Sequence, residues 1–161
     1  MSVDPAQFRN ALSRYATGVT VVTAILPGGR PAGVTVSSFT SLSLTPPLIL
    51  FCLARSVTCL PAFTDGRHFA VNVLAECQRD LSVTFATQSP DKFKGIDYDL
   101  SANGVPLLKN CLANLECSRE AVHEGGDHLI IVGRVEATRL AEDGPPLVYH
   151  RGSYRRATDA V

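Results

Sequence analysis

The sequence predicts a mainly β protein, an antiparallel β-barrel with peripheral helices. Runs of β-branched and apolar residues recur along the chain, separated by short segments that contain glycine or proline. Only three segments carry helix signals, and strands do not alternate with long helices as they would in a parallel α/β sheet. The 161 residues are 45% hydrophobic, which is enough apolar material for the core of one domain of ordinary size.

The first expected helix begins at Pro5. Asp4 can cap it, and Gln7 lies where a capping box places its return donor. Gly18 is expected to end this helix. Apolar residues at the helical period lie between these points: Phe8, Ala11, Leu12, Tyr15 and Ala16. The other two helices are expected over residues 56–63, capped by Ser56, and over residues 76–86. The residues expected in the core include Phe8, Phe69, Leu81 and Phe85.

Strands are expected over most of the remaining chain. They cover residues 19–26, 31–38, 48–54 and 68–74, two long strands within 112–140, and one short strand within 146–156. Pro27–Arg30 is expected to form a turn, and Gly125-Gly126 joins the two long strands. The hydroxyl-rich connection before residue 48 is expected to be a loop that Pro46-Pro47 ends.

Charge and cysteine content disfavour several classes of protein. Fifteen basic and fifteen acidic residues cancel, so no overall field attracts nucleic acid or an anionic membrane. The sequence has no apolar run of membrane-spanning length, no N-x-[ST] sequon, no CxxC and no apolar leader segment. We therefore expect a cytoplasmic protein with reduced, mostly buried thiols at Cys52, Cys59, Cys77, Cys111 and Cys117.

Several common catalytic motifs are absent from the sequence. No GxGxxG follows a strand, and no GxxxxGK[ST] occurs. Ser37 and Ser38 lie in no nucleophile elbow and have no marked base. His123 and His128 flank the Gly125-Gly126 turn and fall on different strands, so no metal site is expected. Acyl-transfer and zinc chemistry are therefore disfavoured.

Two polar segments stand out instead. Ser37–Ser41 places four hydroxyls and one aromatic ring between two strands, where a turn ordinarily uses glycine, asparagine or aspartate. Hydroxyls and backbone N–H groups donate to neutral heteroaromatic rings without adding charge. Arg55–Thr58 offers a cation, two hydroxyls and a helix start, a donor set that suits a phosphate. Together the segments fit a flavin, although an ordinary loop and a solvated helix cap have the same composition.

The order of several motifs narrows this interpretation. The chain contains "FRNALSRYATGVTVVTA", "AGVTVSSFTSLSLTPPLILFCLARSVT", "GRHFAVNVL", "DKFKGIDY", "GVPLLKNCLANLECS", "EGGDHLIIVGRV" and "PLVYHRGSYR". In this order, from about Phe8 to Arg155, the motifs resemble those of the short-chain NAD(P)H:flavin oxidoreductases. These enzymes are the reductase components of two-component flavin-dependent monooxygenases. The SSFTSLS-x-x-PP block and the GDH triplet are the most specific parts of the resemblance.

The resemblance implies an FMN-binding split barrel with Greek-key antiparallel topology. It implies one domain over residues 1–161, with its core at about residues 8–155, and a homodimer with flavin near the subunit interface. The implied reaction is hydride transfer from NADH or NADPH to N5 of FMN or FAD, and release of reduced flavin to a partner monooxygenase. Two alternatives stay open: a non-catalytic flavin carrier, and an enzyme on the same barrel that resembles a pyridoxine phosphate oxidase.

The resemblance also implies the site residues. Those expected at the isoalloxazine are Thr35, Ser37, Ser38, Phe39, Thr40 and Ser41, and those expected at the phosphate are Ala54, Arg55, Ser56 and Thr58. Lys92 and Phe93 would approach the flavin tail or ring. His128 is the catalytic candidate, because it would orient the nicotinamide carboxamide or supply a proton. Asp127 is expected only to shape the turn.

Three residues near the C-terminal end of the motif series have two interpretations. Tyr149, Arg151 and Tyr154 offer aromatic faces and a cation, which suit the edge of a nucleotide. Alternatively they cover the end of the barrel as amphipathic side chains.

The chain also departs from the family pattern at two places. It has Thr45 where the family often has aspartate, and Ala54-Arg55-Ser56-Val57 where the family often has Asn-Arg-Ser-Ser. The choices between FMN and FAD, and between NADH and NADPH, stay open.

Overall fold

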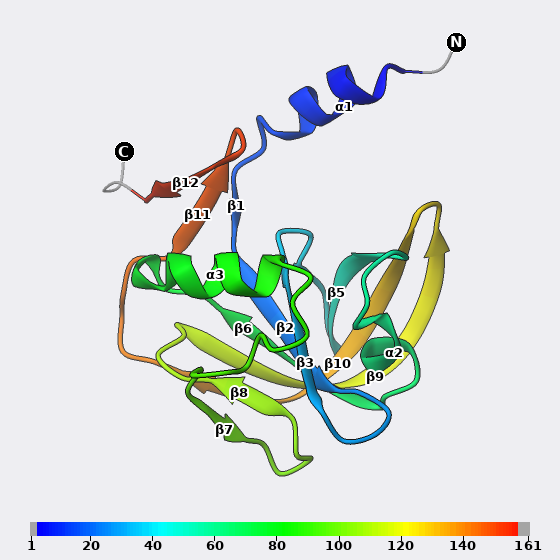
Figure 1. The fold of residues 1–161 in the computed structure, drawn as a ribbon, viewed down its shortest axis with the longest axis vertical. Coiled ribbons are helices and arrows are strands. Elements are labelled where there is room, and N and C mark those ends of the chain that lie inside the picture. The colour runs from blue at the N-terminus through cyan, green and yellow to red at the C-terminus, as the bar shows by residue number, and fades with distance from the viewer. Residues whose placement is uncertain (1–2, 158–161) are drawn as a thin grey trace.

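The computed structural model describes residues 3–157. Its main feature is a seven-stranded antiparallel sheet in the order β3-β2-β6-β9-β10-β5-β4, which forms the centre of the molecule (Figure 1). These strands are β2 (Thr20–Ile25), β3 (Pro31–Val36), β4 (Thr40–Leu44), β5 (Pro47–Ala54), β6 (His68–Val73), β9 (Ala113–Gly125) and β10 (His128–Leu140). The sheet curves until β3 also contacts β5. The predicted β-rich barrel is confirmed.

Two smaller sheets flank the barrel. One has the order β1-β11-β12, and the other pairs β7 with β8. Their strands are β1 (Thr17–Gly18), β7 (Tyr98–Leu100), β8 (Pro106–Leu108), β11 (Leu147–His150) and β12 (Ser153–Arg156). The prediction of a single short strand near the C-terminal end was wrong, because the segment forms the β11–β12 hairpin. Strands β1, β7 and β8 were not predicted, since two or three residues are too few to show a period.

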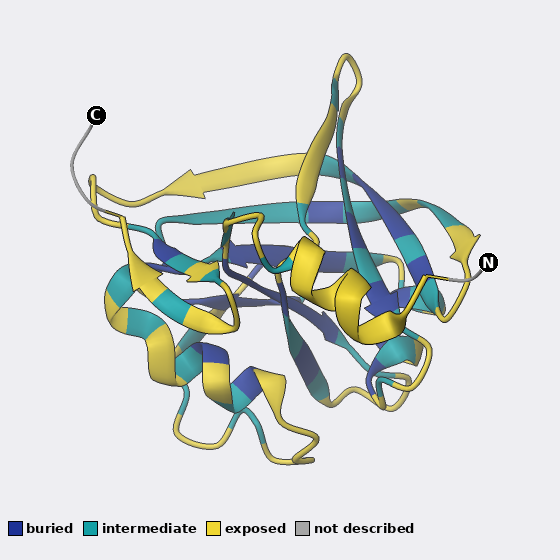
Figure 2. Cartoon of the chain, turned by 90° about the horizontal axis from the view of Figure 1, so that it is seen from above, coloured by how far each residue is buried: buried dark blue, intermediate teal, exposed yellow. Residues whose placement is uncertain are grey.

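The structure contains the first predicted helix, α1 (Pro5–Leu12). The prediction is correct for its start and wrong for its end. The Asp4 carboxylate accepts from the Gln7 backbone N–H at 2.9 Å, as the capping signal predicts. The helix stops at Leu12, however, well before Gly18. None of its residues is buried, and Phe8 is 54% exposed, so its assignment to the core was wrong. Figures 1 and 2 show why: α1 projects from the barrel and is exposed along its whole length.

The second helix, α2 (Leu60–Thr64), starts later than predicted. Ser56 lies in a turn and is not the N-cap, a position that Cys59 occupies. Pro61 explains the shift, because proline is favoured in the first turn of a helix, where no N–H is required.

The third predicted helix is confirmed over residues 76–86, but its first turn is a 3₁₀ segment. It comprises η1 (Glu76–Gln78) and α3 (Arg79–Ala86). Phe85 on α3 is fully buried, and Leu81 packs against the same apolar cluster. Phe85 lies in the core as predicted, and Leu81 is partly buried at the edge of the core. Among the described residues, no helix is long and apolar enough to cross a membrane.

The centre of the barrel is aromatic. Phe51, Phe63 and Phe69 meet edge to face, with ring centroids 5.3–6.4 Å apart, an arrangement in which aromatic pairs attract. The Phe69 prediction is therefore also confirmed. Phe51 and Leu53 of β5 belong to the same core cluster, so the strand that leads to Arg55 is anchored in the core.

The cysteine side chains are reduced, and most of them are buried. All five cysteines are free, and Cys59, Cys111 and Cys117 are buried. Burial raises the pKa of Cys111 to about 11 and that of Cys117 to about 12, from an ordinary value of 9.0.

As the pH rises, the Cys111 and Cys117 thiols therefore lose their protons in the unfolded chain before they lose them in the folded protein. We expect their contribution to stability to be complete below about pH 9 and to be lost between about pH 9 and 12. Urea unfolding of wild type and Cys117→Ala over this range measures it. The difference between the two proteins should shrink as the pH rises, and a constant difference would contradict the assignment.

Candidate functional site

A single serine fixes the connection between β3 and β4. The Ser38 hydroxyl accepts from the Cys52 N–H at 2.9 Å and donates to the Cys52 carbonyl at 3.0 Å. It thus imitates a strand residue beside β5, and it holds the Ser37–Phe39 connection against the end of that strand. The predicted hydroxyl loop is shorter than expected, because Thr40 and Ser41 already belong to β4.

The side chains of the hydroxyl segment do not all face one ligand. The Thr35 hydroxyl donates to the Ser82 carbonyl on α3 at 2.6 Å, and Phe39 packs against the barrel core. Ser37 and Ser41 are exposed, as is Thr40, whose hydroxyl lies 3.3 Å from the Ser41 carbonyl. β4 is an edge strand and pairs on one side only, with β5. Some of its backbone N–H groups therefore have no strand partner among the described residues. The free donors of this segment are backbone groups and the exposed hydroxyls.

Arg55 connects the end of β5 to the β9–β10 turn. Its Nε donates to the Gly126 carbonyl at 3.1 Å, its backbone N–H donates to the Asp127 carbonyl at 3.0 Å, and its guanidinium pairs with Glu124. The Arg55 side chain is still 45% exposed. The phosphate candidate is therefore positioned by the turn and accessible, with an acidic neighbour that an incoming phosphate would displace.

His128 lies on the other side of this turn. It is opposite Ala54 in the β10–β5 register. Ala54 immediately precedes Arg55 in the sequence, so the pairing brings His128 close to the Arg55 backbone. Its Nδ1 is 2.7 Å from Asp127 Oδ1, and this hydrogen bond lowers the pKa of the Asp127 carboxyl. With Nδ1–H directed at a carboxylate, Nε2 is the ring nitrogen left for a ligand. Asp127 thus orients His128 as well as shaping the turn, a role that the adjacent Asp-His pair in the sequence could have indicated.

A cavity of about 600 Å³ extends the site beyond Thr58. Thr58, Cys59, Lys92 and Phe93 are among the residues that line it. The Lys92 ammonium donates to the carbonyls of Gly33 at 3.1 Å and Phe85 at 3.0 Å, and burial lowers its pKa. Phe93 meets the rings of Phe85 and Tyr98 edge to face, so it borders the cavity mainly as a core residue. Ser56, which is exposed in the turn before Thr58, is outside the cavity lining.

The remaining predicted residues lie elsewhere. Tyr149 and Tyr154 pack together on the β11–β12 hairpin with centroids 5.4 Å apart, and the Tyr154 hydroxyl bonds Ser82 at 2.8 Å. The Arg151 N–H donates to the Ser13 carbonyl at 2.9 Å. Figure 1 shows this hairpin beside α3 and β1, away from the β9–β10 turn that carries His128. Within one chain Tyr149 and Tyr154 contact each other, and Tyr154 contacts α3 through Ser82. A role of the three residues at a nucleotide stays a prediction.

Comparisons with known proteins identify the family of this chain. Residues 12–158 match the model of the flavin reductase like domain. The chain is 42% identical over 153 residues to the flavin-dependent monooxygenase reductase subunit HsaB of Rhodococcus jostii, covering 95% of this chain and 78% of that protein. It is 47% identical over 150 residues to the FMN reductase (NADH) SmoA of Agrobacterium fabrum, covering 92% and 84%.

A solved structure is similar to this protein over nearly the whole chain. The NADH:FAD oxidoreductase SgcE6 of Streptomyces globisporus, in complex with NAD and FAD fragments, superposes with a TM-score of 0.90. It is 36% identical, and the match covers 98% of this chain and 97% of that one. The match confirms the predicted flavin reductase split barrel. The chain belongs to the flavin reductase-like domain family, which includes the reductase components of two-component flavin-dependent monooxygenases.

Proposed function

We propose that this protein is an NAD(P)H:flavin oxidoreductase that reduces FMN or FAD and supplies the reduced flavin to a partner monooxygenase. The observation that supports it most is the meeting of three motifs along the end of β5. Ser38 forms two hydrogen bonds with the Cys52 backbone, and His128 is opposite Ala54, the last residue of β5. Arg55 is the first residue after the strand. Segments far apart in the sequence thus form one continuous set of ring, phosphate and nicotinamide candidates.

The residues of the chain have separate tasks in this proposal. When bound, the flavin supplies the hydride acceptor and NAD(P)H the donor. Backbone N–H groups and hydroxyls of Ser37–Ser41 stabilise negative charge on the ring edge without a titratable group. Arg55 and Thr58 hold the phosphate, and His128 orients the carboxamide through Nε2 while Asp127 fixes its ring.

The proposal includes a homodimer, a single domain over residues 1–161 and a cytoplasmic location. The apolar side chains of α1 support the dimer, since Phe8 and Leu12 are more than half exposed within one chain and a second copy would cover them. The compact β-rich core supports one domain. The five free cysteines support a reducing compartment.

Steady-state assays test the proposed function. Purified protein with FMN or FAD should oxidise NADH or NADPH well above the rate of flavin and nucleotide alone. Flavin binding without nucleotide oxidation would replace the proposal with a flavin carrier. Peroxide formation from a pyridoxine phosphate without NAD(P)H would replace it with an oxidase on the same barrel.

His128→Ala tests the nicotinamide side of the site. Loss of one hydrogen bond to the carboxamide should lower kcat/KM for NAD(P)H about 3–10-fold, the equivalent of about 0.5–1.5 kcal/mol. The Kd for flavin should not change, because His128 is assigned no contact with the ring. Asp127→Asn is the matched variant, and it should give a smaller loss by freeing the imidazole. An equal loss of flavin affinity, or no change in kcat/KM, would contradict the assignment.

A further inference from the structure

The cavity beside Thr58 has room for more than a flavin mononucleotide phosphate. Its volume of about 600 Å³ is in the range of pockets that enclose a small organic ligand. It opens where the proposed phosphate segment ends, because Thr58 belongs to both. A ligand whose first phosphate lies at Arg55–Thr58 would continue into this cavity.

The charged side chains of the cavity favour a second phosphate. Arg30, Lys92 and Lys94 are three cations on its lining, against one acidic side chain, Asp91. None of the three cations forms an ion pair with another described residue. The Lys92 ammonium is fixed by two carbonyls, whereas Arg30 and Lys94 are exposed and free to turn toward a ligand.

Part of the remaining lining is apolar. Leu26, Pro31 and Pro90 provide surfaces without hydrogen-bonding side chains, and such surfaces accept the face of a planar base. Phosphate donors next to an apolar surface are the combination that an adenylate group requires.

We propose that this cavity binds the adenylate half of FAD, and that Arg30 and Lys94 make the protein prefer FAD to FMN. The inference rests on the proposed flavin reductase function, since it takes the first phosphate to lie at Arg55–Thr58. Both residues are specificity-determining and contact no reacting atom. The 2′-phosphate of NADPH shares the same chemistry, so the test must separate the two nucleotides.

The experiment compares flavin and nucleotide binding to the Arg30→Ala/Lys94→Ala double variant of the full chain. Flavin fluorescence gives the Kd for FAD and for FMN, and steady-state kinetics give KM for NADH and NADPH. The Kd for FAD should rise about 10-fold or more, from the loss of two charge-assisted contacts, while the Kd for FMN stays within about 2-fold. Both side chains are exposed, so the fold should be retained. Arg67→Ala removes one exposed positive charge outside the cavity lining and serves as the control.

Three results would overturn the inference. Equal losses for FAD and FMN would place the cations at the first phosphate. An unchanged Kd for FAD would show that the cavity does not bind the adenylate half of FAD. A rise in KM for NADPH alone would show that the cavity binds the nicotinamide nucleotide instead. Failure of the proposed function is a separate result: no flavin would be reduced by either nucleotide, whatever the ratio of the FAD and FMN affinities.

Discussion

Arg55→Ala is expected to weaken FMN binding by about 1.5–3 kcal/mol, the range for hydrogen bonds to a charged group. Riboflavin, which has no phosphate, should lose much less. The structure makes this separation testable, because the guanidinium is 45% exposed and is positioned by the Gly126 carbonyl and by Glu124. Titration of both flavins by fluorescence, with wild type and variant side by side, measures the difference.

Two matched variants separate the charge of Arg55 from its structural role. Arg55→Lys keeps the positive charge but loses the planar fork that bonds Gly126, so it should recover part of the FMN affinity. Glu124→Gln removes the carboxylate that pairs with the guanidinium and should tighten FMN binding. Equal losses of FMN and riboflavin in Arg55→Ala would show that the residue supports the β9–β10 turn and not the phosphate.

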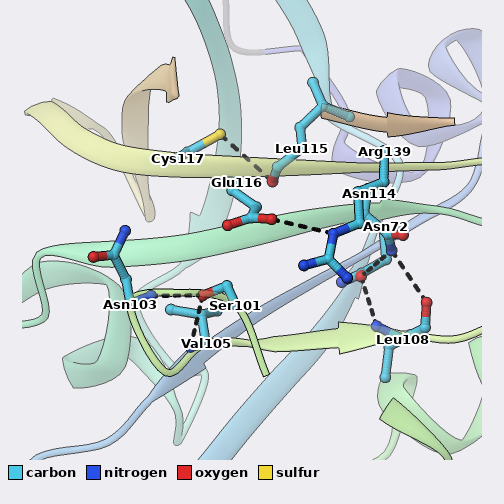
Figure 3. A network of polar contacts seen from close by, with 10 residues as sticks. All are labelled: Asn72, Ser101, Asn103, Val105, Leu108, Asn114, Leu115, Glu116, Cys117 and Arg139. Carbon is cyan, nitrogen blue, oxygen red and sulfur yellow. Dashed lines mark hydrogen bonds and ion pairs between the residues drawn. The ribbon is translucent and has the colours of Figure 1, made fainter. Parts of the chain in front are cut away.

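Asn72→Ala should have the largest effect on stability, lowering the free energy of unfolding by about 3–4 kcal/mol. Asn72 is fully buried on β6. Its amide N donates to the Val21 carbonyl at 2.8 Å and to the Thr23 hydroxyl at 3.1 Å. Its Oδ1 accepts from the Leu108 N–H at 2.9 Å and from Asn114 at 2.8 Å, and Figure 3 shows these two contacts. Truncation removes all four bonds and leaves the Leu108 N–H without its acceptor, whereas the Thr23 hydroxyl and the Asn114 amide keep their bonds to Pro106 and Leu108.

Urea unfolding checks this expectation, and Asn103→Ala is its matched control. Asn103 lies in the same region (Figure 3), but its side chain is exposed and, within residues 3–157, its one side-chain hydrogen bond is to Glu136 at 3.5 Å. Its truncation should change stability by less than about 0.5 kcal/mol. A loss of less than about 1 kcal/mol in Asn72→Ala would mean that water or a rearranged backbone satisfies the exposed groups.

Local signals in the sequence predicted the elements that depend on local chemistry. The Asp4 cap and the β-branched run of β2 each act over a few residues, and both are confirmed. The predicted glycine turn between the two long strands is confirmed in place but shifted by one residue, because Gly125 ends β9 and Gly126-Asp127 forms the turn. β4 was missed because its Thr-Ser-Leu-Ser-Leu sequence leaves Leu42 and Leu44 exposed, and because its position is set by pairing with β5 around a bulge. The exposure of Phe8 was missed because helical periodicity indicates an apolar face but not what covers it.

The candidate site was predictable in its parts but not in its assembly. Residue types marked Ser38, Arg55 and His128, and the family resemblance gave each a role. The contacts that bring them together join residues distant in sequence, such as Ser38 with Cys52 and Arg55 with Gly126. No local pattern encodes these contacts. For the same reason the sequence could not show that Thr35 bonds α3, or that Phe93 packs in the core.

Anaerobic stopped-flow mixing of the protein and FAD or FMN with NADH or NADPH tests whether the protein reduces flavin. The visible absorbance of the flavin should bleach in a rapid phase that depends on the protein. His128→Ala should slow this phase without weakening flavin binding. Bound flavin that keeps its absorbance with both nucleotides would show that the protein is not a flavin reductase.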